Sequence, residues 1–227
     1  MTLLCVGFIA MHFFTGSPAG PLMATTVWGS SASWALTALP LFIWMGEILF
    51  RTRVSEDMFR GLAPWVEPLP DRLMHTNVVG CGIFAAISGS SAATAATIGR
   101  ISIPELKARG YDERMAIGSL AGAGTLGLLI PPSIIMIVYG VAADVSIARL
   151  FVAGVLPGML LILLFSGYIA IWALRNPGLT PAREKITTFA EKIFAARLLI
   201  PTTLLIGAVI GSIYSGVATP TEAAVLA

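Results

Sequence analysis

Two short stretches carry the residues that could do chemistry, and both interrupt apolar sequence. The first is Ser88-Gly89-Ser90-Ser91, which offers hydroxyls together with backbone amides and carbonyls. If a helix begins near Ser91, the positive end of its dipole is available to an anion and the neighbouring carbonyls to a cation. Small residues also recur at every fourth position from Ser88, as in close helix packing. Ion binding and packing are compatible, and both interpretations stay open.

The second stretch ends at Ser133 and contains the consecutive prolines Pro131 and Pro132. Proline lacks the N–H that bonds the carbonyl four residues earlier, so the carbonyls of Gly127 and Leu128 lose their helical partners. A carbonyl freed inside a membrane is costly unless something binds it, and Na⁺ is a natural candidate because it is small, hard and oxygen-seeking. The alternative is a proline kink whose carbonyls are satisfied by Ser133 or by a neighbouring helix. Two adjacent interruptions are typical of transporter sites.

Ionisable side chains near the apolar segments are few. Glu47, Asp144 and Glu222 lie near segment ends or in a turn, which indicates interface or capping roles rather than a proton relay. The two cysteines and two histidines stand apart in the sequence, so we expect no disulfide, no metal site and no cofactor. A phosphate-binding Gly-Lys motif is missing, which disfavours an ATP-driven pump and an enzyme. We predict no catalytic residue.

The composition indicates that lipid is the solvent. Of the 227 residues, 56% are hydrophobic and 11% are charged, and the mean hydropathy is +0.87. Soluble domains carry about 25% charged residues. The apolar runs are long and lack the period-two alternation of barrel strands, so the backbone must bond within helices. The predicted fold class is an all-α polytopic membrane protein in a lipid bilayer. A net charge of +2 without a basic run argues against a nucleic-acid partner.

Breaks in the apolar pattern divide the chain into four parts. These are N-terminal membrane helices (1–50), an interfacial arm (51–72), the two interrupted segments (73–149), and membrane helices with a cytoplasmic arm (150–227). After residue 99 we expect membrane segments at 115–141, 150–174 and 198–215. The chain ends at a helix start, Thr219-Pro220-Thr221-Glu222, which we expect to open a truncated second repeat.

Residues 73–99 could form one long spanning helix or a hairpin of two half-length helices. The basic residues separate these possibilities, because cytoplasmic segments are rich in lysine and arginine. A hairpin that turns at Ser88-Gly89-Ser90-Ser91 puts every basic residue except Arg149 on the cytoplasmic side. A single spanning helix would place the four arginines before it opposite the next four basic residues. We therefore predict a re-entrant helical hairpin followed by a proline-broken helix.

Four motifs follow one another along the chain in a specific combination. They are Pro40-Leu41-Phe42 with Met45-Gly46-Glu47, Ile87-Ser88-Gly89-Ser90-Ser91-Ala92-Ala93-Thr94-Ala95-Ala96, Gly124-Thr125-Leu126-Gly127 with Ile130-Pro131-Pro132-Ser133, and Gly216 with Ala218-Thr219-Pro220-Thr221-Glu222-Ala223-Ala224. In this order they resemble the N-terminal half of the large membrane (permease) subunit of tripartite ATP-independent periplasmic (TRAP) transporters. The resemblance covers nearly the whole chain.

The resemblance implies one half of an inverted-repeat, elevator-type transporter in the bacterial inner membrane. Such a subunit imports small organic acids (carboxylates) with Na⁺, beside a small membrane subunit and a periplasmic binding protein that delivers substrate. The matching motifs imply Na⁺-binding residues at Ser88, Gly89, Ser90, Gly127, Ile130 and Pro132. They imply substrate-binding residues at Ser91 and Ser133, and no metal other than Na⁺.

Two alternatives keep the predicted fold and change the function. One is another ion-coupled anion transporter with similar re-entrant hairpins. The other is a non-transporting fragment or remnant, because the sequence holds one of two expected halves and stops inside its last predicted helix.

Overall fold

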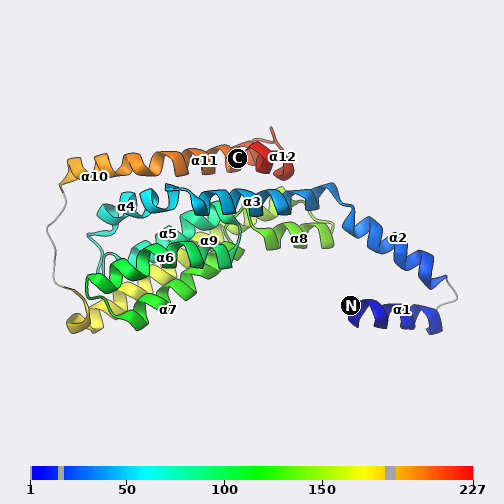
Figure 1. The fold of residues 1–227 in the computed structure, drawn as a ribbon, viewed down its shortest axis with the longest axis horizontal. Helices are drawn as coiled ribbons and strands as arrows, with labels where there is room; N and C mark the ends of the chain where they lie inside the picture. The colour runs from blue at the N-terminus through cyan, green and yellow to red at the C-terminus, as the bar shows by residue number, and fades with distance from the viewer. Residues whose placement is uncertain (1, 15–17, 182–187, 227) are drawn as a thin grey trace.

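The computed structural model describes residues 2–14, 18–181 and 188–226, and every regular element among them is a helix (Figure 1). This confirms the all-α prediction. Within these described ranges, two helices are long and apolar enough to cross a membrane. They are α9 (Ile147–Arg175) and a rod, Phe189–Tyr214, that joins α10 (Phe189–Ala196), η4 (Arg197–Leu199) and α11 (Ile200–Tyr214).

The rod begins earlier than the segment expected at 198–215. Residues 189–197 of the polar arm expected at 175–197 belong to this rod, because α10 runs into α11 through one 3-10 turn. The rod starts with a capping box, in which the Thr188 N–H donates to Glu191 Oε2 at 2.7 Å. Residues 182–187 of the expected arm lie outside the described residues. A short 3-10 turn, η3 (Pro177–Leu179), follows α9.

The N-terminal helices reach away from the rest of the molecule before the chain returns to it (Figure 1). The elements in order are α1 (Thr2–Phe14), α2 (Ala19–Ser31), η1 (Trp34–Thr37), α3 (Ala38–Arg51) and α4 (Val54–Val66). The bent pair Ala19–Gly29 and Trp34–Leu49 has the length and composition of one further span. Helix α4 continues along the line of α3 and packs against α10 and η4.

Residues 74–108 form the predicted hairpin. Helices α5 (Met74–Ser88) and α6 (Ser91–Ala108) lie side by side and turn at Gly89 and Ser90. The interrupted segment follows as α7 (Glu113–Gly124), η2 (Thr125–Leu128) and α8 (Ile134–Ala142). Asn77 ties α5 to α7, because its Nδ2 donates to the Ala116 carbonyl at 3.2 Å and to Ser119 Oγ at 3.0 Å. The structure therefore has a helical hairpin and not one long helix.

Two buried apolar clusters hold these elements. The first packs the hairpin against α7 and α9 and includes Val78, Phe84, Ile98, Leu126 and Ile169. The second joins α3, the hairpin tip, α8, α9, α11 and α12 (Pro220–Leu226), and includes Phe42, Ile87, Ile137, Phe151 and Ile213. In lipid such side chains stabilise helix contacts by close van der Waals packing rather than by leaving water, and the end of α5 contributes to both clusters.

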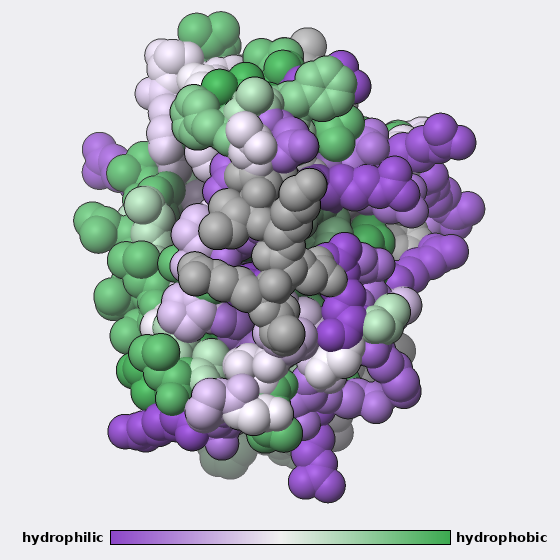
Figure 2. Space-filling view, turned by 90° about the vertical axis from the view of Figure 1, so that its left-hand side faces the viewer, coloured by the Kyte–Doolittle hydropathy of each residue, from purple (hydrophilic) through white to green (hydrophobic). Residues whose placement is uncertain are grey.

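At one end of the molecule, one side of the surface is mostly apolar and the other is mostly hydrophilic. Figure 2 looks at the end of the molecule where α6, α9 and α10 meet the loops, with hydrophobic residues gathered on one side and hydrophilic residues on the other. On α9, Leu156 is 78% exposed and Leu163 is 68% exposed. Large exposed apolar side chains along a helix of this length suit contact with lipid or with other membrane helices.

Candidate functional site

The hairpin turns through a glycine in the left-handed conformation. Gly89 has φ +59°, a backbone conformation that favours glycine, and its N–H donates to the Ala85 carbonyl at 3.0 Å. Ser90 then caps α6, and its Oγ accepts the N–H of Ala93 at 3.4 Å. The tip therefore presents the C-terminus of α5 and the N-terminus of α6 at one point.

Hydrogen-bonded hydroxyl groups connect the two helices at the tip. Thr94 Oγ1 donates to the Ser90 carbonyl at 2.7 Å and lies 2.8 Å from Ser88 Oγ. Since the Thr94 proton is used on the carbonyl, Ser88 is the donor to Thr94. Thr94 was not among the site residues predicted from the sequence. Its signal was the spacing of four residues from Ser90, at which a threonine bonds back to the helix backbone.

The facing segment breaks at the two prolines, as predicted. Helical bonding continues as far as the Ile130 N–H, which donates to the Leu126 carbonyl at 2.8 Å. Beyond it, Ser133 Oγ donates to the Leu128 carbonyl at 2.6 Å. For Leu128 the structure therefore favours the alternative explanation, in which a neighbouring serine satisfies the carbonyl that the proline left without its helical partner.

The hairpin tip and the broken helix touch through their backbones. The Ile134 N–H donates to the Gly89 carbonyl at 3.2 Å. A Cβ atom on Gly127 would lie 2.7 Å from the carbonyl carbon of Ser90, and one on Gly89 would lie 2.7 Å from the Pro132 carbonyl oxygen. Contacts this short exclude any side chain, so glycine at both positions is a condition of the arrangement.

This contact brings the six expected Na⁺-binding residues into one region. Ser88, Gly89 and Ser90 come from the tip, and Gly127 and Pro132 lie directly against it. Ile130 lies in the break between them, with its side chain packed towards Gly158 of α9. The polar groups are hydroxyl and carbonyl oxygens, which suit a hard cation. A carbonyl that accepts one hydrogen bond keeps a second lone pair.

The two residues expected to bind substrate differ in their bonding. Ser91 Oγ is buried and has no hydrogen-bond partner among the described residues. Ser133 is fully buried and its hydroxyl proton is used on Leu128. Ser91 lies at the first turn of α6, where the helix dipole favours an anion. An unpartnered buried hydroxyl at this point is free to donate to a ligand, whereas the Ser133 hydroxyl is already engaged.

The carboxylates of Glu47, Asp144 and Glu222 lie at exposed positions near helix ends. Glu47 forms an exposed ion pair with Arg51, with Oε1 2.7 Å from Nε. Asp144 is exposed in the turn after α8, at φ +54°. Glu222 accepts the Thr219 N–H at 2.7 Å and caps the start of α12.

Comparison with known proteins assigns the chain to a family. The family model of the tripartite ATP-independent periplasmic transporter, DctM component, matches residues 1–227. The chain belongs to this family. The predicted resemblance to TRAP large permeases is thereby confirmed.

Several curated TRAP permeases are similar to the chain. The C4-dicarboxylate TRAP transporter large permease protein DctM of Pseudomonas aeruginosa is 36% identical over 205 residues, which is 90% of this chain and 47% of that protein. The ectoine/5-hydroxyectoine TRAP transporter large permease protein UehC of Ruegeria pomeroyi is 36% identical over 190 residues, 84% of this chain and 44% of that protein. The isethionate TRAP transporter permease protein DctMQ of Oleidesulfovibrio alaskensis is 34% identical, over 98% of this chain and 35% of that protein.

These relatives are named as transporter permeases and not as enzymes. The chain spans about half the length, or less, of the curated relatives it matches. Their names give different substrates, so membership of the family leaves the transported molecule open.

Proposed function

We propose that the chain forms part of a Na⁺-coupled importer of small organic acids in the bacterial inner membrane. It provides the first hairpin and the first broken helix of an elevator-type transport domain. The observation that carries the proposal is the backbone contact between the Gly89–Ser90 turn and the Gly127–Pro132 break. Discontinuous helices that meet at membrane depth are where transporters hold ions and substrates.

The oxygen atoms of this contact support Na⁺ as the coupling ion. Ser88, Ser90 and the carbonyls of the break supply hard donors without a carboxylate, and a singly charged cation suits such a neutral site. Among the described residues there is no group of three or more His, Cys, Asp or Glu that could hold a metal ion. The Na⁺ would bridge the tip and the break, and its binding would favour their closed contact.

The start of α6 supports an acidic substrate. Ser91 places an unpartnered buried hydroxyl at the positive end of a helix of 18 residues. A carboxylate there would accept a hydrogen bond from the Ser91 hydroxyl and gain from the helix dipole, worth about 0.3–1 kcal/mol and up to about 2 kcal/mol when partly buried. The family's name supports work with a periplasmic binding protein, and the fused name DctMQ of one relative supports a small membrane partner.

Uptake in proteoliposomes tests the proposal. The full-length protein, its small membrane partner and its binding protein would be given a radiolabelled C4-dicarboxylate under an inward Na⁺ gradient or an equal K⁺ gradient. We expect uptake with Na⁺ alone, and a weaker Na⁺ dependence in Ser90→Ala and in Pro132→Ala. Equal uptake in Na⁺-free, proton-buffered vesicles would contradict Na⁺ coupling. Uptake without the binding protein would favour a different ion-coupled anion transporter.

A further inference from the structure

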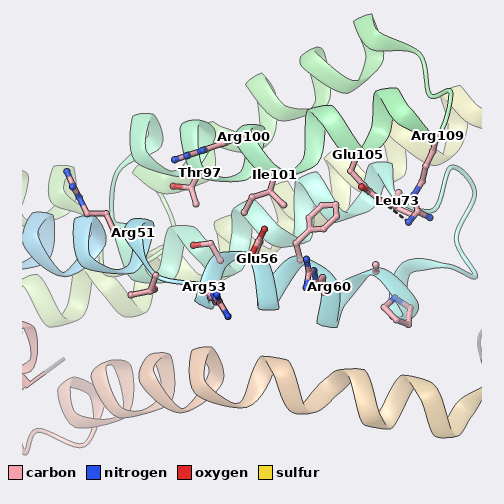
Figure 3. A pocket seen from close by; sticks show the side chains of 15 residues that line it. Arg51, Arg53, Glu56, Arg60, Leu73, Thr97, Arg100, Ile101, Glu105 and Arg109 are labelled. Carbon is pink, nitrogen blue, oxygen red and sulfur yellow. Dashed lines mark hydrogen bonds and ion pairs between the residues drawn. The ribbon is translucent and has the colours of Figure 1, made fainter.

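A second polar region lies apart from the hairpin tip, between α4 and α6. It is a cavity of about 780 Å³, and these two helices form its opposite walls (Figure 3). Five arginines line it: Arg51, Arg53, Arg60, Arg100 and Arg109. They come from the end of α3, the turn before α4, the middle of α4, α6, and the turn that follows α6. Nothing in the proposed transport site uses them.

The cavity carries an excess of positive charge. Two glutamates, Glu56 and Glu105, also line it, so the lining residues sum to a net charge of +3, of which the charge of Arg51 is paired with Glu47 outside the lining. Glu105 forms an ion pair with Arg109 at 2.7 Å. Within the described part of the chain, neither Arg53 nor Arg60 forms an ion pair with an acidic side chain, although Glu56 stands between them on α4. These two guanidinium groups therefore have no ion pair to break before they bind a ligand.

The shape and position of the cavity favour a small soluble anion. An arginine guanidinium binds carboxylate and phosphate groups through two parallel hydrogen bonds. Several arginines around one partly enclosed space raise the local concentration of anions by about 10-fold or more. The cavity lies at the end of the molecule that the positive-inside rule places in the cytoplasm. Figure 2 shows this end from outside, with its hydrophilic residues gathered on one side, away from the apolar residues that suit lipid.

The cavity also reaches towards the hairpin tip. Its lining includes Thr97 on α6. Thr97 lies six residues after Ser91 on the same helix, which is about 9 Å at 1.5 Å per residue. An anion that left the tip towards the cytoplasm would meet this space next.

We propose that the cavity between α4 and α6 binds small soluble anions of two or more negative charges, at a site separate from the hairpin tip. Binding depends only on the arginines of this cavity. The idea that released substrate binds in this cavity rests on the function proposed above. Binding of another cytoplasmic anion there does not depend on that function.

Thiol labelling in the full-length protein tests the proposal. Accessible cysteines, including the exposed Cys5, would be replaced, and a probe would be introduced as Ala63→Cys at a position that lines the cavity. The rates of reaction with an anionic and a cationic methanethiosulfonate of similar size would be measured in Na⁺-free buffer. We expect the anionic reagent to be favoured about 10-fold or more, relative to a free thiol. Millimolar inorganic phosphate should slow labelling at least twofold.

Matched variants identify the arginines. Arg53→Gln with Arg60→Gln should abolish both the preference for the anionic reagent and the protection by phosphate. Arg114→Gln with Arg175→Gln removes the same charge at the same end but outside the cavity lining, and should change neither. If Ala63→Cys does not fold, the exposed Thr52→Cys on the cavity lining gives the same readout.

The outcomes are distinct. Equal reactivity towards both reagents, or no protection by phosphate, would overturn the proposal. Protection by phosphatidylglycerol in nanodiscs, with none by phosphate, would also overturn it and assign the cavity to a lipid headgroup. The labelling assay needs neither Na⁺ nor transport. Anion binding in the cavity can therefore be found even if uptake is not coupled to Na⁺, and Na⁺-coupled uptake can be found even if the cavity binds no anion.

Discussion

Gly127 of the broken helix lies so close to Ser90 of the hairpin tip that a Cβ atom at position 127 would be 2.7 Å from the Ser90 carbonyl carbon. Real Cβ atoms do not approach other atoms this closely, so the backbone contact exists only because residue 127 is glycine. The contact joins the two elements that carry the proposed Na⁺ site. It also makes their separation sensitive to a single methyl group.

Gly127→Ala should push the tip away from the break. Overpacking of this kind costs about 1–3 kcal/mol, because backbone atoms cannot rotate out of the way as a side chain can. We expect a lower thermal unfolding midpoint in detergent and loss of Na⁺-dependent uptake in proteoliposomes. Gly118→Ala on α7 is the control, because a Cβ there meets nothing within 4 Å. Wild-type Na⁺ dependence in Gly127→Ala would place the ion elsewhere.

Ser133→Ala should destabilise the break itself. The substitution removes the hydroxyl that donates to the Leu128 carbonyl at 2.6 Å and leaves that carbonyl without its hydroxyl partner, at a cost of about 1–3 kcal/mol. The thermal unfolding midpoint measures this. Ser215→Ala is the matched control, because Ser215 Oγ bonds a helix carbonyl in the same way at an exposed position. Equal effects of the two substitutions would show that the Ser133 bond adds no stability.

Local backbone chemistry made the tip and the break predictable from the sequence. Gly89 marks the turn because the left-handed conformation favours glycine, and Pro131 and Pro132 mark the break because proline has no N–H. The count of basic residues then selected the hairpin over one long helix. Each of these inferences needs only neighbours in the chain or the side of the membrane, and each agrees with the structure.

Contacts between distant segments were not predictable in the same way. The arginine-lined cavity combines α4 with α6, whose residues are some 40 positions apart, and no periodicity in the sequence relates them. The sequence did not predict that the membrane rod starts at Phe189, because the polar residues of α10 were assigned to a separate arm. Arg197, at the expected boundary, is compatible with a continuous helix. For the Leu128 carbonyl, the sequence offered Na⁺ or a hydrogen bond from Ser133 or a neighbouring helix, and the structure shows the hydrogen bond from Ser133.

Ser91→Ala should separate binding from stability. Its hydroxyl has no partner in the described structure, so its removal should leave the thermal unfolding midpoint unchanged or slightly higher. If the hydroxyl donates to a charged substrate, its loss should raise the KM for uptake by about 10-fold, or about 1.4 kcal/mol. Ser102→Ala is the control, because Ser102 is also buried, unpartnered and on α6, but away from the tip. An unchanged KM in Ser91→Ala would remove Ser91 from the substrate site.

The base of the hairpin contains a buried acid. Asp71 is 7% exposed, lies at φ +64°, and its carboxylate oxygens have no hydrogen-bond partner among the described residues. Burial, and then repulsion from Asp112, raise the pKa of Asp71 from 3.8 to about 6. The folded protein therefore holds a proton on Asp71 in a pH range where the unfolded chain has lost it.

Asp71→Asn should remove a pH dependence of stability between pH 4 and pH 6. When the pKa of a carboxyl is higher in the folded state, its ionisation lowers the free energy of unfolding. This loss is absent below pH 3.8, grows as the pH rises, and is complete above pH 6. We expect Asp71→Asn to be more stable than the wild type at pH 7.5, by about 1–2 kcal/mol after solvent screening, and equal to it near pH 4. Asparagine tolerates the left-handed conformation as aspartate does, so the backbone is preserved. Unfolding midpoints of the full-length protein from pH 4 to pH 7.5 measure the difference, and Asp144→Asn, also left-handed but exposed, is the control. Parallel pH profiles for the wild type and Asp71→Asn would show that the Asp71 carboxylate is ionised without cost.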